Sequence, residues 1–251
     1  MMAPATLPTR RDEAWRYSDL DAAAQVWPVG APERIVVAPG EVRTLALLQD
    51  GADGESIVRD HLVEIGASGT LNVHLLNSGG TLGRVTFDVT MARHAHFELK
   101  AALIGGAAQT IELVTTLNHA EPEATSAQTV RAIAAGKATT NYLGQIRVAR
   151  DAQKTDAAQS FKAMLLGRTA TANAKPELEI FADDVKCAHG ASIGQLDAAA
   201  LFYMASRGID PTSAKALLLE AFIAGLFDDM ADEAERERFA TVARARLEAL
   251  G

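Results

Sequence analysis

The residues best suited to chemistry lie together in one segment, residues 181–197. This segment holds the only cysteine of the chain, Cys187, and His189 follows it two positions later. In an extended strand, residues two apart project from the same side. A thiolate beside an imidazole is a ligand pair suited to iron, to zinc or to sulfur chemistry.

Two ligands do not complete a closed tetrahedral metal site, which needs four. Because the sequence has no second cysteine, a metal or cluster held here needs ligands from another chain, so chemistry at Cys187 predicts an interface. The alternative is a buried Cys187 that acts as a small hydrophobic residue beside a hydrogen-bonded histidine. The neighbouring Asp183 and Asp184 make a poor glycosidase pair, because adjacent strand residues point in opposite directions.

Composition and charge exclude several classes of function. The chain has 251 residues, of which 48% are hydrophobic and 22% charged, as is typical of a soluble chain of one or two domains. A net charge of −8 disfavours a basic nucleic-acid-binding face. No apolar run predicts a membrane span or a secretory signal, and a single cysteine favours the reducing cytoplasm. The common nucleotide-binding, hydrolase and zinc-protease motifs are absent.

Three regions must position the Cys187 segment. Residues 1–33 form a short N-terminal segment that contains both tryptophans. Residues 34–195 alternate apolar and polar side chains in short runs, which predicts strands. Residues 196–251 change to helical periodicity. Strands followed by helices favour a mainly β fold with α over a doubly wound α/β sheet.

The strand region contains a repeat of 31 residues. A strand that ends in a glycine turn and recurs once per coil indicates a parallel β-helix, and the alternative is an antiparallel sandwich with regular turns. The repeated positions are Gly105, Gly136 and Gly167, then Lys100, Arg131 and Lys162, then Ala101, Ala132 and Ala163.

The C-terminal region predicts helices with apolar faces. Asp210 before Pro211 is typical of an N-cap followed by proline in the first turn. Such faces usually pack in a core, although part of this surface could contact a partner. The predicted faces comprise Leu196, Ala200, Tyr203 and Met204, then Phe239, Val242, Ala243, Leu247 and Leu250.

Both ends of the chain resemble the SufB/SufD family of iron–sulfur cluster assembly proteins. The resemblance rests on residues 183–191, 194–197, 200–203 and 206–209, and on Leu7–Arg11 with Glu13, Trp15–Tyr17 and Leu20. Between the ends, only the strand pattern matches. The single cysteine and the tryptophan motif favour the SufD branch. The chain is shorter than many such relatives, so we expect fewer coils and little of the N-terminal helical domain.

The resemblance implies a right-handed parallel β-helix core with a C-terminal helical domain. It implies a non-catalytic scaffold subunit that pairs with a SufB-like paralogue and binds the SufC ATPase, where the ATPase activity resides. Cys187 and His189 then lie at the SufB interface as shared ligands of a transient, nascent iron–sulfur cluster, with no cofactor bound stably by the isolated chain. The expected SufC anchors are Leu201, Phe202, Leu218 and Phe222.

Two other functions are compatible with a β-helix. The first is a stand-alone structural homodimer that pairs through the end of the solenoid. The second is an enzyme that acts on polysaccharides, but the sequence lacks carboxylate clusters at the coil spacing, and this disfavours it.

Overall fold

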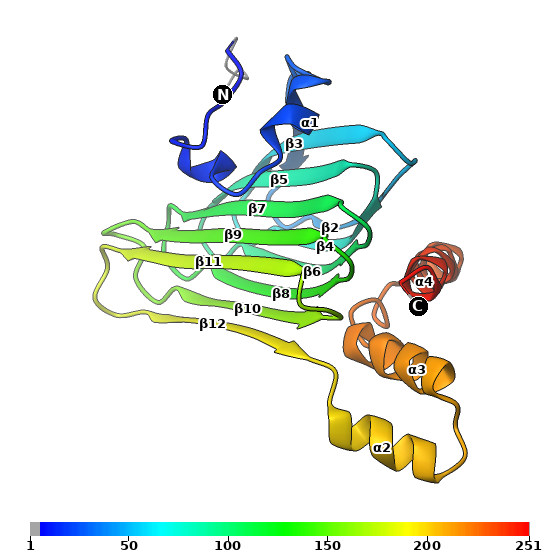
Figure 1. Ribbon diagram of the computed structural model, residues 1–251. Helices are drawn as coiled ribbons and strands as arrows, with labels where there is room; N and C mark the ends of the chain where they lie inside the picture. Colours follow the sequence, from blue (N-terminus) through cyan, green and yellow to red (C-terminus); the bar gives the residue numbers. More distant parts are fainter. Residues whose placement is uncertain (1–5, 251) are drawn as a thin grey trace.

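A computed structural model describes residues 6–250 and shows a β-solenoid followed by three helices (Figure 1). The chain passes alternately between two six-stranded parallel sheets, with about one strand in each sheet per coil. One sheet contains β1 (Glu33–Val37), β3 (Ser56–Ile65), β5 (Leu82–Met91), β7 (Thr110–His119), β9 (Thr139–Val148) and β11 (Thr171–Ile180). The other contains β2 (Val42–Gly51), β4 (Thr70–Gly79), β6 (His96–Gly105), β8 (Thr125–Ala134), β10 (Asp156–Leu165) and β12 (Lys186–Gln195). The predicted parallel β-helix is confirmed.

The strand register corrects part of the predicted repeat. Arg131 pairs with Lys162, 31 residues later, as predicted. One coil earlier the offset is only 29 residues, because Gly105 pairs with Ala134 rather than aligning with Gly136. The turns between the ten-residue strands differ in length, so no single period holds along the chain. Gly136 is a true turn glycine, with a φ of +62°, whereas Gly105 is a strand residue.

Alternate residues of each strand point into the solenoid and form its core. Leu71 and Phe97 are aligned on neighbouring strands of one sheet, and Val85 and Leu113 on strands of the other. All four side chains are fully buried. Because parallel strands stack similar positions above one another, the core is a set of columns that continue from coil to coil.

The C-terminal helices cover the outer face of the even-numbered sheet. α3 (Pro211–Ile223) and α4 (Glu233–Glu248) bury one face each, and the N-cap Asp210 accepts hydrogen bonds from the backbone N–H groups of Thr212 and Ser213. This second core combines Leu219, Ile223, Leu226, Met230, Phe239, Ala243 and Leu247 with Leu76, Ala102, Ile104 and Ile133 of the sheet. Among residues 6–250, no helix combines the length and apolarity needed to cross a membrane.

α2 (Ala198–Ser206) differs from the other two helices because it buries no residue. It projects from the end of β12 and extends beyond the solenoid (Figure 1). Of the two alternatives left open for this apolar face, packing in the core does not apply to Tyr203, which is 58% exposed. Helical periodicity shows which residues share a face, but it does not show whether anything covers that face.

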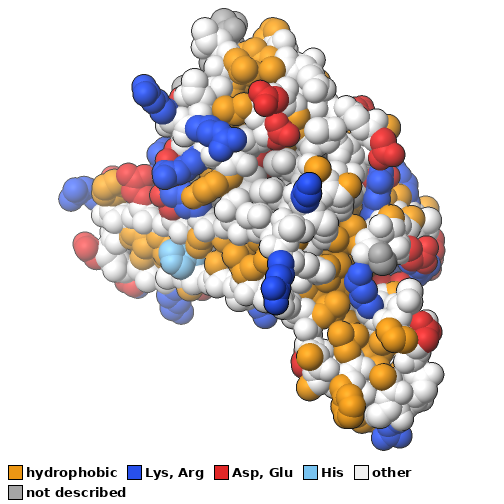
Figure 2. Space-filling view, in the orientation of Figure 1, with side chains coloured by type: hydrophobic (Ala, Val, Ile, Leu, Met, Phe, Trp, Pro, Cys, Tyr) orange, Lys and Arg blue, Asp and Glu red, His pale blue; other side chains and the backbone are white. Residues whose placement is uncertain are grey.

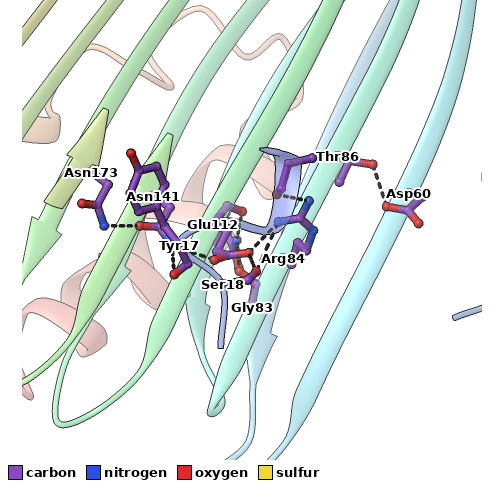
Figure 3. A network of polar contacts seen from close by, with 11 residues as sticks. Tyr17, Ser18, Asp60, Gly83, Arg84, Thr86, Glu112, Asn141 and Asn173 are labelled. Atoms are coloured by element: carbon purple, nitrogen blue, oxygen red, sulfur yellow. Dashed lines mark hydrogen bonds and ion pairs between the residues drawn. The ribbon is translucent and has the colours of Figure 1, made fainter. Parts of the chain in front are cut away.

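The N-terminal segment, with η1 (Glu13–Trp15) and α1 (Leu20–Ala24), is fixed to the outer face of the odd-numbered sheet by buried polar groups (Figure 3). Arg84 bonds Glu112 at 2.7 Å and the carbonyl oxygen of Ala14 at 2.8 Å. Its guanidinium carbon lies 3.8 Å from the centre of the Trp15 ring. Asn141 continues the row and donates to both Glu112 and the carbonyl oxygen of Tyr17. This network explains how the tryptophan motif is held.

Candidate functional site

The solenoid has an open end at its last coil. β12 pairs with β10 alone, and β11 pairs with β9 alone, so each sheet ends in a strand with a free edge. The inward residues of β12 therefore have a neighbouring coil on one side only. Cys187 lies above Ala157, and His189 lies above Gln159.

Cys187 is half-buried and packs against the end of the apolar core. Burial raises the pKa of its thiol, and the charge of Asp156 raises it further. The thiol therefore stays protonated at neutral pH. A cysteine binds a metal or a cluster only as a thiolate. Cys187 can therefore act as a ligand only when a metal ion or another positive charge at this end of the solenoid favours loss of the thiol proton.

His189 lies on the same side of β12 as Cys187 and is exposed. None of the described residues hydrogen-bonds its ring, so both ring nitrogens are accessible. Within residues 6–250 there is no group of three His, Cys, Asp or Glu side chains that could hold a metal ion. The pair is thus an incomplete donor set on the inward side of β12, at the open end of the solenoid.

Asp183 and Asp184 lie in the bend before β12 and not on the strand. Asp184 forms an ion pair with Lys154 of the preceding coil. The backbone N–H of Asp184 also donates to Gln153. These contacts fasten the turn that leads into β12, and so they help to place Cys187.

The four expected anchors are in different environments. Phe202 on α2 is 78% exposed. Leu201 and Leu218 are half-buried. Phe222 packs against the core between α3 and the sheet, so it already has a structural role within this chain.

Sequence reasoning missed several exposed hydrophobic residues near these positions. Figure 2 shows hydrophobic side chains along the open end between β11 and β12 and over the projecting α2. They include Phe181 and Ile193 at the solenoid end and Tyr203 and Leu217 on the helices. Strand alternation alone assigns Ile193 to the core, and only the number of coils shows that nothing covers it.

Comparison with known proteins identifies the family. The family described as SUF system FeS cluster assembly, SufBD core domain, matches residues 30–222. The chain belongs to the SufBD family. This match spans the solenoid, α2 and most of α3, so it covers both the open end and the exposed helix.

Individual relatives of this SufBD-family chain agree with that result. It is 38% identical to the iron–sulfur cluster assembly protein SufD of Escherichia coli K12, over 49% of this chain and 29% of the relative. A SufBD family protein of Synechocystis is 34% identical over 62% of this chain and 34% of its own. The chloroplastic protein ABCI7 of Arabidopsis thaliana is 38% identical over 59% of this chain and 31% of its own length.

The chain thus aligns with about a third of the length of these curated relatives. The relatives support a SufD-type protein of iron–sulfur cluster assembly.

Proposed function

We propose that this chain is a non-catalytic scaffold subunit that pairs through its open end with a SufB-like paralogue and binds a SufC-type ATPase through its C-terminal helices. The observation that carries the proposal is the incomplete donor pair, Cys187 and His189, on an uncovered last coil. A paralogue placed there supplies the missing ligands, and a nascent cluster is assembled between the two chains.

The edges of the last coil support pairing. Free strand edges present unpaired backbone N–H and C=O groups and promote association unless something covers them. Here the edges lie beside exposed hydrophobic side chains: Phe181 is 56% exposed and Ile193 is 48% exposed. A second solenoid could extend both sheets and bury these residues together.

The helices support ATPase binding. α2 exposes two aromatic rings, and a groove of about 390 Å³ lies between α3 and α4, lined by Leu217, Ala221, Phe227 and Ala240 among others. Because α3 and α4 share a core with the solenoid, movement of the helices is transmitted to the sheet. ATP changes the open end only if the ATPase binds the two states with different affinity.

Substitution at each end of the solenoid tests the pairing. Ile193→Glu places a charge on the open end, and Val42→Glu places the same charge on β2, where Val42 is an apolar strand residue that is even more exposed, at 72% against 48% for Ile193. We expect Ile193→Glu to abolish binding of the SufB-like paralogue and Val42→Glu to preserve it. The measurement is co-expression of tagged chain with both partners, followed by light scattering of the purified species.

Recovery of a complex that contains both partners supports the scaffold function. A homodimer that is equally stable in the presence of the partners supports the stand-alone alternative. A chain that binds neither partner, or loss of binding with Val42→Glu alone, contradicts the proposal.

A further inference from the structure

A column of polar side chains crosses the outer face of the odd-numbered sheet and ends at its free edge (Figure 3). The strand register aligns Arg84 on β5, Glu112 on β7, Asn141 on β9 and Asn173 on β11. Asn141 donates to Glu112 at 2.6 Å, and Asn173 donates to Asn141 at 2.8 Å. The first three residues are buried, whereas Asn173 on the edge strand is half-buried. One chain of hydrogen bonds therefore runs from the buried ion pair to the open end.

The carboxylate of Glu112 fixes the direction of this chain. A carboxylate accepts hydrogen bonds and donates none, so Asn141 must turn its Nδ2 toward β7. Both N–H groups of that nitrogen are used, one by Glu112 and the other by the carbonyl oxygen of Tyr17. Asn141 therefore has only its oxygen to offer toward β11, and Asn173 has to donate to it.

The same orientation at Asn173 leaves a hydrogen-bond acceptor at the free edge. Its Nδ2 points back along the column to Asn141, so its Oδ1 lies on the side of β11 where no strand follows. Among residues 6–250, no group donates to this oxygen, which faces solvent in the isolated chain. A strand that covers the edge excludes solvent, and a buried acceptor without a donor costs free energy.

We propose that Asn173 selects the side chain that lies opposite it on the partner's edge strand, and that this side chain donates a hydrogen bond to Asn173 Oδ1. The inference rests on the proposed function, since the covering strand belongs to the SufB-like paralogue. Opposite side chains on one face of adjacent strands lie about 5 Å apart, within reach of such a bond.

The proposal defines the chemistry and the register of the paired strand. An asparagine or glutamine amide opposite Asn173 continues the column across the interface, whereas a carboxylate would place two acceptors against each other. A slip of one residue turns every side chain of a strand to the other face of the sheet. Such a slip would leave Asn173 without its donor, so the bond favours a single register.

Variants of nearly equal size separate this role from a general effect at the interface. Asn173→Leu removes both the donor and the acceptor, whereas Asn173→Asp removes the donor toward Asn141 and keeps an acceptor at the edge. Thr171→Val is the matched control. Thr171 lies two positions earlier on the same edge and face, is exposed, and its hydroxyl has no hydrogen-bonding partner among residues 6–250. The readouts are the Kd of each purified chain for the SufB-like paralogue, measured by titration, and urea unfolding of each free chain.

We expect Asn173→Leu to raise the Kd about tenfold, because it leaves the partner's donor buried without an acceptor. Asn173→Asp and Thr171→Val are expected to keep the Kd within about twofold of the unsubstituted chain. The bond to Asn141 that Asn173→Asp loses is missing from the free and the bound chain alike. That loss therefore appears in urea unfolding and not in binding.

Two results overturn the inference while the pairing itself stands: equal Kd values for Asn173→Leu and Thr171→Val, or an equal rise for Asn173→Leu and Asn173→Asp. If the unsubstituted chain does not bind the paralogue at all, the proposed function fails and the inference fails with it.

Discussion

At the scale of single residues, the solenoid interior contains a titratable group that has no role in the proposed site. His119 is fully buried, and its Nε2 lies 3.0 Å from the Ser126 hydroxyl. Burial lowers its pKa to about 4. A histidine that stays neutral in the fold but gains a proton when unfolded makes the stability depend on pH.

The sign of this dependence follows from the two pKa values. Above pH 6.5, the ordinary pKa of histidine, His119 is neutral in both the folded and the unfolded chain, so it does not make stability depend on pH there. Between pH 6.5 and about 4 only the unfolded chain binds the proton, so stability falls, by up to about 3 kcal/mol. Urea unfolding at pH 7 and pH 4.5 should therefore show a smaller loss for His119→Gln than for the unsubstituted chain. An equal loss in both would mean that His119 is not the group responsible.

Spacing within one strand was enough to predict that Cys187 and His189 share a side. The buried hydrogen bond from the Tyr142 hydroxyl to Gln159 Oε1 could not be predicted in this way, because the register between coils brings these two residues together. That register depends on turns of unequal length, as the two-residue error at Gly105 shows. Gly144 is a glycine within a strand pattern, but only the structure shows that a Cβ atom there would lie 2.3 Å from both the Tyr142 hydroxyl oxygen and Gln159 Oε1.

At the scale of elements, the N-terminal segment is attached through a buried ion pair. The side chains of Arg84 and Glu112 are 3% and 1% exposed. Glu112→Gln removes the negative charge and leaves the guanidinium buried without compensation, which typically costs about 3–5 kcal/mol. We expect urea unfolding to show a loss of stability of this size. We also expect altered tryptophan fluorescence, because Trp15 stacks on Arg84.

The control for this prediction is Glu64→Gln. Glu64 pairs with Arg34 at the same distance, 2.7 Å, but both side chains are about half exposed. An exposed pair contributes under about 1 kcal/mol. Similar losses from the two substitutions would show that burial of the Arg84–Glu112 pair does not matter.

The loop between α3 and α4 is attached to the sheet at Asp229. This carboxylate lies 3.0 Å from Nε2 of the buried His74 and 2.6 Å from Nζ of Lys100. Burial opposes ionisation of Asp229, but the hydrogen bonds from Lys100 and His74 outweigh it and leave its pKa below the ordinary 3.8. Its contribution to stability is therefore complete above pH 3.8 and is lost as the pH falls through the lowered pKa.

Asp229→Asn is expected to cost about 1 kcal/mol at pH 7, a modest value because the carboxylate is nearly half exposed. The difference from the unsubstituted chain should shrink below pH 3.8. Asp228→Asn is the control, since Asp228 forms no ion pair among the described residues. Urea unfolding of the three chains measures both effects, and an equal loss from Asp228→Asn would argue against a specific attachment.

At the scale of the whole molecule, the two uncovered surfaces, the last coil and α2, follow each other directly along the chain. The last coil ends at β12, and the chain continues directly into α2, which projects beyond the solenoid (Figure 1). Periodicity predicted the coils and the helices, because stacking and amphipathic faces leave local patterns. It could not predict that the last coil and α2 are uncovered, because exposure depends on where neighbouring elements end.

The separation of these two surfaces predicts that the two partners can be lost independently. Phe202 lies on α2, which buries no residue, and its side chain is exposed. A charged side chain at this position therefore disturbs neither the solenoid core nor the open end. We expect Phe202→Asp to abolish binding of the ATPase while the SufB-like paralogue still binds. Val36→Asp, at an exposed apolar position of β1, should leave both interactions intact. Pull-down of each partner separately with the tagged variants measures this. Loss of the paralogue with Phe202→Asp would mean that α2 belongs to the solenoid interface, and that one continuous surface binds a single partner.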